Sequence, residues 1–216
     1  MSINKTYAVF GLGRYGIAVA RELAANGIEV LAIDNDEGRV SVAAADIPLC
    51  KCADITDPEV IKQLGIGNID VVIIAMAGNL EASVMAITLC KEAGVGRVIA
   101  KCSSEMHQKI LERVGADMVV FPERESGIRL AKNLLSSGFV DMITLSPDFS
   151  MIELEVRPDW VGKSLMELNL RKKYNINVVA LKKGDKLTVN IPPEEKLAEG
   201  SSLIIIANPS KISKIK

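Results

Sequence analysis

The sequence predicts an α/β protein in which a doubly wound parallel sheet is followed by a small α+β lobe. Up to about residue 135, short β-branched runs alternate with helical patterns. The first run leads directly into Gly11-Leu12-Gly13-Arg14-Tyr15-Gly16, the G-x-G-x-x-G pattern of dinucleotide-binding βαβ units. Together these observations indicate a Rossmann-type sheet in domain 1–135. A crossover or linker (136–149) and a C-terminal lobe (150–216) follow.

Six strand candidates and six helical segments alternate in the first domain. Boundary residues support the helices, because Gly27 and Gly94 lie just past two helix ends and Asp57 precedes Pro58 as an N-cap residue should. The strands are expected at 6–10, 29–33, 48–52, 71–75, 98–101 and 118–121. The helices are expected at 15–25, 36–43, 58–64, 80–92, 104–114 and 123–135.

The C-terminal lobe has a different pattern. Ser136-Ser137-Gly138 interrupts the last helical segment, and the character of the sequence changes after Ser146-Pro147-Asp148. Strands are expected at 151–156, 177–181, 187–190 and 203–207, with one short helix near 164–168.

The glycine motif has a mechanical basis for binding a diphosphate. Gly11 allows the tight turn, Gly13 lets the backbone approach the phosphates, and Gly16 lets the helix pack closely on the strand. The following helix supplies N–H groups and the positive end of its dipole. Asp34 lies 21 positions after Gly13, where a carboxylate can accept hydrogen bonds from the two hydroxyls of an unphosphorylated ribose.

Composition limits the classes of function. The formal charge of −1 argues against a nucleic-acid binder. The longest apolar run, Val71 to Ala77, is far shorter than the ~20 residues of a membrane span, and the first residues lack a signal-peptide core. We therefore expect a cytoplasmic protein that reaches any membrane through a partner.

The inventory of reactive side chains is small. Cys50, Cys52, Cys90 and Cys102 are interpreted as reduced and mostly buried thiols, with no metal or redox spacing. His107, the one histidine, lies in a polar helical stretch and is interpreted as a solvated surface residue. Because hydride transfer needs a positioned acid or base beside the cofactor, a non-enzymatic role is favoured over a dehydrogenase.

Five polar residues lie at positions suited to gripping a nucleotide. Arg14 could reach a terminal phosphate or be a solvent-exposed loop residue. Asp54 could contact the adenine edge or cap a helix, although Asp57 fits the capping role better. Asn79 follows a strand at the carboxyl edge of the sheet, Lys101 ends the fifth strand at the same edge, and a further candidate, Glu123, comes after the sixth.

The chain resembles the RCK (KTN) family, which includes the cytosolic regulatory subunits of Ktr/Trk-type bacterial potassium uptake systems. The resemblance covers both domains in order. In the first domain, the matching stretches are Val9 to Gly16, Ala53 to Asp57, Ala75 to Asn79, Gly115-Ala116-Asp117 and Pro122-Glu123. In the second they are Gly162 to Leu165, Leu168 to Arg171, Val178-Val179-Ala180, Gly184, Pro192, Gly200 and Leu203.

This resemblance implies a non-enzymatic gating ring, an octamer assembled from dimers and docked on a KtrB-like potassium-translocating subunit at the inner face of the cell membrane. ATP and ADP would compete for the glycine-rich site, with Arg14 contacting the γ-phosphate, often from the neighbouring subunit. A divalent cation (Mg²⁺ or Ca²⁺) would lie at Glu123. The nucleotide-binding residues implied are Gly11, Gly13, Arg14, Tyr15, Gly16, Asp34, Asn35, Asp54, Ile55, Ala77, Gly78, Asn79, Lys101 and Glu123.

The resemblance also implies cyclic di-AMP binding across a dimer of C-terminal lobes. The matching positions are Leu165, Arg171, Ile176, Asn177 and Pro193, and Ile176 stands where the family often has histidine or cysteine. The alternative for this lobe is a dimerisation module without a ligand. For the whole chain, the alternative is an NAD(H)-binding redox sensor or dehydrogenase, since Asp34 is compatible with NAD. A transcription regulator is disfavoured because no helix-turn-helix pattern is present.

Overall fold

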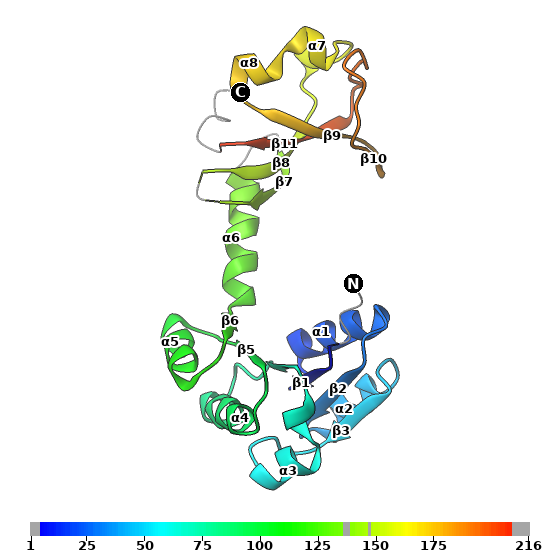
Figure 1. The fold of residues 1–216 in the computed structure, drawn as a ribbon. Coiled ribbons are helices and arrows are strands. Elements are labelled where there is room, and N and C mark those ends of the chain that lie inside the picture. Colours follow the sequence, from blue (N-terminus) through cyan, green and yellow to red (C-terminus); the bar gives the residue numbers. More distant parts are fainter. Residues whose placement is uncertain (1–4, 136–138, 147, 209–216) are drawn as a thin grey trace. The chain divides into compact units, whose positions relative to one another are not determined.

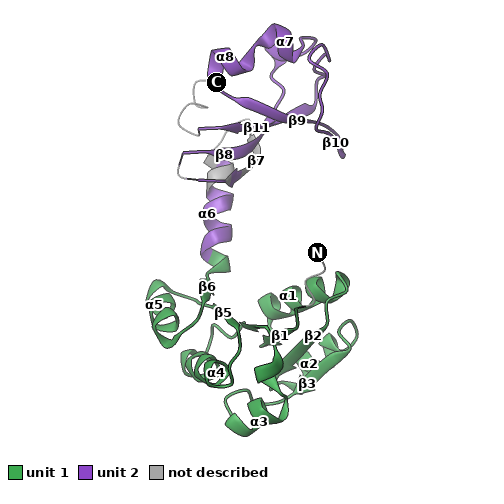
Figure 2. Ribbon diagram, viewed as in Figure 1, with its two compact units in different colours: residues 1–123 green, residues 124–216 purple. Residues whose placement is uncertain are grey.

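The computed structural model describes residues 5–135, 139–146 and 148–208, and it divides into two compact units. Unit 1 comprises Met1–Glu123 and unit 2 comprises Arg124–Lys216 (Figure 2). Among the helices described, none combines the length and the apolar character that a membrane span requires.

Unit 1 is a parallel six-stranded sheet in the order β3-β2-β1-β4-β5-β6, the doubly wound arrangement that the sequence predicts (Figure 1). All six strands and six helices have bounds within one residue of those expected. The strands are β1 (Tyr7–Phe10), β2 (Val30–Asp34), β3 (Leu49–Cys52), β4 (Val71–Ile74), β5 (Arg97–Lys101) and β6 (Met118–Val120). The helices are α1 (Arg14–Ala25), α2 (Glu37–Ala43), α3 (Pro58–Gln63), α4 (Leu80–Glu92), α5 (Glu105–Val114) and α6 (Pro122–Leu135), with a 3-10 turn η1 (Ile66–Asn68).

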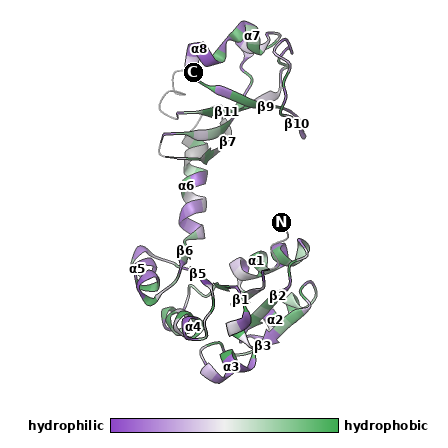
Figure 3. Cartoon of the chain, viewed as in Figure 1, coloured by the Kyte–Doolittle hydropathy of each residue, from purple (hydrophilic) through white to green (hydrophobic). Residues whose placement is uncertain are grey.

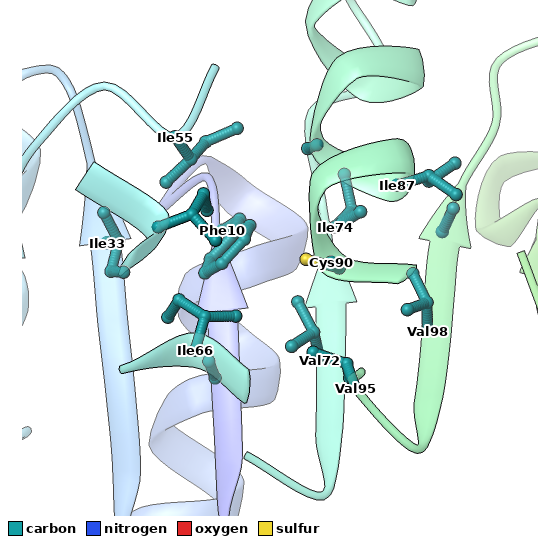
Figure 4. Close-up of a cluster of buried hydrophobic side chains, with 14 of the residues drawn as sticks. Phe10, Ile33, Ile55, Ile66, Val72, Ile74, Ile87, Cys90, Val95 and Val98 are labelled. Carbon is teal, nitrogen blue, oxygen red and sulfur yellow. The ribbon is translucent and has the colours of Figure 1, made fainter. Parts of the chain in front are cut away.

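Helices cover both faces of this sheet, so its central strands are apolar throughout. On one face, Phe10 and Ile74 pack against residues of α3, η1, α4 and α5, among them Ile66 and Ile87 (Figure 4). On the other face, alternate strand residues such as Val9 pack against α1 and α2. The order of strands reverses between β1 and β4, which leaves a crevice at their carboxyl ends.

The expected helix boundaries have the expected chemistry. The Asp57 side chain accepts a hydrogen bond from the Glu59 N–H at the start of α3. Gly94 has a φ of +86°, the left-handed conformation in which a glycine ends a helix without strain.

Unit 2 is built on an antiparallel five-stranded sheet in the order β10-β9-β11-β8-β7. Its core contains Ile152, Leu203 and the one tryptophan of the chain, Trp160. The strands are β7 (Phe139–Thr144), β8 (Ser150–Glu155), β9 (Asn177–Lys183), β10 (Lys186–Thr188) and β11 (Ser201–Ala207). The helices are η2 (Pro158–Trp160), α7 (Leu165–Leu168) and α8 (Leu170–Tyr174).

Two elements of unit 2 differ from the sequence-based expectation. Strand β7 lies inside 136–149, which was expected to be a crossover or linker, and it pairs with β8. Helix α8 has only five residues between Asn169 and Asn175, both left-handed, so it is too short to show a helical period.

Helix α6 was assigned to the first domain from the sequence, whereas unit 2 begins at Arg124, within this helix. The residues of α6 that follow Glu123 and have described side chains are exposed, and they are largely hydrophilic in its first turns (Figure 3). They therefore add little to the core of unit 1, and Ser136-Ser137-Gly138 lie outside the described residues.

The surface interpretation of His107 is wrong. The residue is only 5% exposed, because it lies one turn before Leu111 on the buried stripe of α5. Its Nδ1 lies 3.2 Å from the Ser103 hydroxyl, and burial lowers its pKa. The polar residues beside it in the sequence hid this inward position.

The cysteines are less buried than expected. All four are free thiols, but only Cys90 and Cys102 are buried, while Cys52 is exposed on edge strand β3. Burial raises the pKa of Cys90 to about 12, so this thiol stays protonated.

A nucleotide-sized cavity at the carboxyl edge of the parallel sheet

A cavity of about 760 Å³ opens at the carboxyl ends of β1, β2, β4 and β5 in unit 1. Its volume is within the range of small-molecule and cofactor sites, about 300–1,000 Å³. Every residue implied for nucleotide binding by the resemblance lines this cavity except Gly16. Residues that the sequence analysis did not select also line it, and they include Arg39 and Met76.

The glycine loop has the shape that a phosphate cradle needs. Gly11 has a φ of +91° and donates its N–H to the Ile33 carbonyl at 2.8 Å. A Cβ added at Gly13 would meet no atom within 4 Å, whereas a Cβ at Gly16 would collide with the Gly11 carbonyl oxygen. Gly16 therefore acts behind the cavity, by letting α1 approach the loop.

The N-terminus of α1 is open toward a ligand. In the described structure, no side chain caps this helix and its first turn holds no acidic residue. The first N–H groups of a helix lack partners within the helix, and they carry the positive end of its dipole. Because the glycine loop directs this end into the cavity, the residues present fit the phosphates of a nucleotide.

Asp34 is a buried carboxylate at the end of β2, with only 3% of its side chain exposed. Its Oδ2 accepts the Leu12 N–H at 2.6 Å and its Oδ1 accepts the Asp36 N–H at 2.9 Å. Asp34 therefore holds the glycine loop and still faces the cavity, where a ribose hydroxyl can reach it.

Arg39 is the charged cavity residue that the sequence analysis missed. Its Nη1 lies 3.4 Å from Asp34 Oδ2, and its Nε lies 3.7 Å from Asp36 Oδ2. The available signal was its place in the first turn of the helix that follows Asp34, since this turn starts at the ligand edge of the sheet.

Asp54 and Asn79 both have structural partners in addition to their places in the cavity wall. Asp54 Oδ1 accepts hydrogen bonds from the N–H and the hydroxyl of Thr56, which lower the pKa of Asp54. Asn79 caps α4 by accepting the Ala82 N–H at 3.0 Å. Ile55, beside Asp54, is largely buried in the core of unit 1.

Lys101 and Glu123 form an ion pair at the wall of the cavity. Lys101 Nζ lies 2.6 Å from Glu123 Oε1 and 5.5 Å from the centre of the Tyr15 ring. The hydrogen bond from Lys101 lowers the pKa of Glu123, and the charge of the nearby Arg14 has a smaller effect in the same direction. The pair places a cation and a carboxylate within reach of one ligand group.

The two other predicted sites are less fully formed in a single chain. Within the described residues, no three histidine, cysteine, aspartate or glutamate side chains gather as a metal site, so Glu123 alone does not complete one. In unit 2, Arg171, Asn177 and Pro193 are exposed and Leu165 is partly buried. Ile176, expected to line a ligand pocket, is instead 1% exposed in the core.

Comparison with known proteins assigns the chain to a family. The TrkA-N domain matches residues 7–122 and the TrkA-C domain matches residues 151–216. The chain belongs to the RCK family of potassium uptake regulators. The expected membership and the expected Rossmann-type sheet with its smaller C-terminal lobe are both confirmed.

Full-length relatives support this assignment. The chain is 36% identical to Ktr system potassium uptake protein C of Bacillus subtilis, with 99% of this chain and 97% of the relative covered. It is 32% identical to Ktr system potassium uptake protein A of the same organism, with 99% and 96% covered. These relatives are named for potassium uptake rather than for a reaction, which supports a non-enzymatic role.

A solved structure shares the fold at lower identity. The GsuK channel bound to NAD aligns with a TM-score of 0.52 and 23% identity, covering 97% of this chain and 37% of that one. The chain thus spans well under half of the channel's length, and the likeness concerns the fold.

Proposed function

We propose that this chain is the nucleotide-sensing subunit of a potassium uptake system, with ATP and ADP competing for the cavity of unit 1. The observation that carries the proposal is the uncapped N-terminus of α1, which opens into a cavity that the cationic side chains of Arg14 and Lys101 help to line. Anions are favoured at such a helix end, and lysine and arginine side chains add charge-assisted hydrogen bonds.

Arg14 is the residue that distinguishes ATP from ADP. It is the first residue of α1, its side chain is exposed, and it lines the cavity beside Glu123. A long, exposed guanidinium can extend to a third phosphate that the helix N-terminus does not reach. Because a ligand shifts a conformational equilibrium only through its different affinity for the two states, this contact gives ATP its separate effect.

Lys101 transmits the presence of phosphate to Glu123. In this structure Lys101 is held by Glu123, and a phosphate group beside Lys101 would compete for the same ammonium. Glu123 lies in the first turn of α6, the helix that continues the chain into unit 2. Exchange of this ion pair therefore changes the charge balance at the start of the connecting helix.

A divalent cation, Mg²⁺ or Ca²⁺, can bind at Glu123 only with additional oxygen ligands. Both ions take six or more ligands, and one carboxylate is insufficient. Nucleotide phosphates or a second copy of the chain would supply the others. Release of Glu123 from Lys101 would free the carboxylate for this role.

The proposed partners are other copies of this chain and a KtrB-like membrane subunit. We expect dimers that assemble into an octameric ring on the cytoplasmic face of the membrane. Light scattering of the purified chain tests the assembly, with a mass near eight times 23.3 kDa expected. A monomer at all nucleotide conditions would contradict the ring.

The C-terminal lobe is proposed to bind cyclic di-AMP in a dimer of unit 2, through Arg171, Asn177 and Pro193. Titration of the full chain with cyclic di-AMP, with Arg171→Ala beside the control Lys186→Ala on strand β10, tests this role. Saturable binding that only Arg171→Ala weakens is expected. If both variants bind cyclic di-AMP as tightly as the wild type, Arg171 is not part of the site. If the wild type does not bind cyclic di-AMP, the lobe is a dimerisation module without a ligand.

The competing function is an NAD(H)-binding redox sensor or dehydrogenase, which Asp34 allows. Calorimetric titration with ATP, ADP and NADH separates the two. Arg14→Ala is expected to raise the Kd of ATP about tenfold, because one charge-assisted contact is lost. The Kd of ADP should change less than about threefold. Arg21→Ala is the matched control, since Arg21 pairs with Asp46 outside the cavity.

Two outcomes would contradict this proposal. An equal loss of affinity for ATP and ADP in Arg14→Ala would show that Arg14 does not act through the γ-phosphate. NADH binding far tighter than that of ATP, or hydride transfer to a supplied carbonyl compound, would favour the redox function.

A further inference from the structure

Arg39 is a charged side chain of the cavity wall to which the proposed gating by ATP and ADP gives no role. It is the third residue of α2, and Asp36, the N-cap of that helix, accepts its backbone N–H at 3.0 Å. The main chain thus fixes where the side chain starts. From there the guanidinium lies beside Asp34, at the part of the cavity where a ribose would bind.

The guanidinium is only loosely held by the protein. Its contacts with Asp34 and Asp36 are 3.4 Å and 3.7 Å long, whereas strong charge-assisted hydrogen bonds measure about 2.7–2.9 Å. The Arg39 side chain is 55% exposed. Arginine offers five N–H donors in a planar fork that matches a phosphate, so its best hydrogen bonds remain available to a ligand.

Asp34, in contrast, already has strong partners. It accepts two backbone N–H groups at 2.6 Å and 2.9 Å, so it does not need Arg39 to fix its orientation. Part of its capacity to accept ribose hydroxyls is also used. Arg39 instead offsets negative charge, because the carboxylates of Asp34 and Asp36 would otherwise repel any anion at the ribose.

We propose that Arg39 is a specificity-determining residue that lets this cavity accept adenine nucleotides with a phosphate on the ribose 2′-oxygen. The guanidinium would turn from its long carboxylate contacts to bind the 2′-phosphate in a bidentate manner. The cavity would then bind nucleotides of the NADPH class as well as nucleotides with an unphosphorylated ribose. This inference rests on the proposed function, namely that the cavity binds adenine nucleotides.

NADH and NADPH are the appropriate probes because they differ only by the 2′-phosphate. We would titrate each into the full-length chain and follow nicotinamide fluorescence, with ADP binding as a check that the site is intact. The variants are Arg39→Ala and Arg39→Lys, which keeps the charge but loses the fork. Arg21→Ala, which removes an exposed arginine outside the cavity, is the control.

The expected result is selective. Arg39→Ala should raise the Kd of NADPH about tenfold or more and that of NADH less than about threefold, while Arg39→Lys gives an intermediate value for NADPH. Equal losses for both ligands would place Arg39 at the adenine or the shared ribose and overturn the proposal. A wild-type chain that binds ADP and NADH but not NADPH would also overturn it.

The outcome for the proposed function is distinguishable from these results. If the wild-type chain binds no adenine nucleotide, the nucleotide site itself is absent and both proposals fail. If ADP and NADH bind, the nucleotide site is retained, and the comparison of NADH with NADPH then tests Arg39 alone.

Discussion

The two units of the chain each have a sheet and an apolar core, but they use their polar groups differently. Unit 1 leaves helix N–H groups and an arginine fork available around a cavity. In unit 2, polar side chains pair with one another, as in the contacts of Glu153 with Lys182 and Ser202. In unit 1 the preformed site therefore comes from groups that the fold leaves available to a ligand.

Topology explains this difference. Parallel strands bring all their carboxyl ends to one edge, so the loops after β1, β2, β4 and β5 converge. Antiparallel strands distribute their ends over both edges, and short connections satisfy the backbone locally. In unit 2 the residues predicted to bind a ligand, such as Arg171 and Asn177, accordingly lie on an exposed surface.

The first prediction tests whether the units are independent and should give the largest effect. Leu203→Ala removes a fully buried side chain from the core of unit 2 and should destabilise that unit by about 2–5 kcal/mol. Trp160 is the one tryptophan and lies in the same core, so its fluorescence during denaturation reports on unit 2. Nucleotide binding by unit 1 should be unchanged.

A loss of nucleotide affinity in Leu203→Ala would show that the units are energetically coupled. Leu187→Ala is the control, because Leu187 is exposed on β10 and its removal should shift the tryptophan transition little.

The second prediction perturbs unit 1 and follows the effect on both units. Gly16→Ala places a Cβ against the Gly11 carbonyl, so α1 must move away from the loop, at a cost of about 1–3 kcal/mol in unit 1. ADP binding should fall by at least tenfold in calorimetry, while the Trp160 transition stays in place. The control Gly127→Ala adds a methyl group where no neighbour is close, and it should retain full binding.

The third prediction concerns acid stability and should give the smallest effect. Asp117 Oδ2 accepts hydrogen bonds from Lys91 Nζ at 2.5 Å and the Val98 N–H at 2.6 Å, and these lower its pKa. A lowered pKa in the folded state stabilises unit 1 fully above the unfolded pKa of about 3.9, and this stabilisation disappears as the pH falls through the folded value. Asp117→Asn should therefore cost about 1 kcal/mol at pH 7 and less below pH ~3.9.

Urea denaturation followed by circular dichroism at pH 7 and in acid measures this difference. Asp46→Asn, which alters an exposed ion pair with Arg21, should cost less than about 0.5 kcal/mol at either pH. A cost for Asp117→Asn that stays constant into acid would show that packing, rather than ionisation, is responsible.

Sequence reasoning was most accurate where a local pattern determines the structure. The glycine motif, Asp34 and the alternating apolar runs give the sheet, because its central strands are buried on both faces and the tight turns need specific residues. The positions of His107 and Arg39 were not predicted, for related reasons. Their positions depend on the direction in which a helix presents one residue, which the neighbouring residues in the sequence do not reveal.

Unit 2 was harder to predict because its elements are short. Strand β7 begins directly after Ser136-Ser137-Gly138, a sequence typical of an interruption in secondary structure. Its place in the sheet depends on pairing with β8. Helix α8 depends on two left-handed asparagines, Asn169 and Asn175, that no periodic pattern reveals. Such tertiary pairing and single-residue conformations are not encoded in a local repeat.

Asp34 holds the glycine loop by its hydrogen bond to the Leu12 N–H. The loop consequently has little disorder left to lose when a ligand arrives, and association needs no slow rearrangement of the backbone. Nucleotides that share this loop should then enter at similar rates and differ mainly in how long they stay. The residence time of a nucleotide, rather than its rate of association, would then determine how long the protein keeps that nucleotide bound after the nucleotide concentrations in the cell have changed.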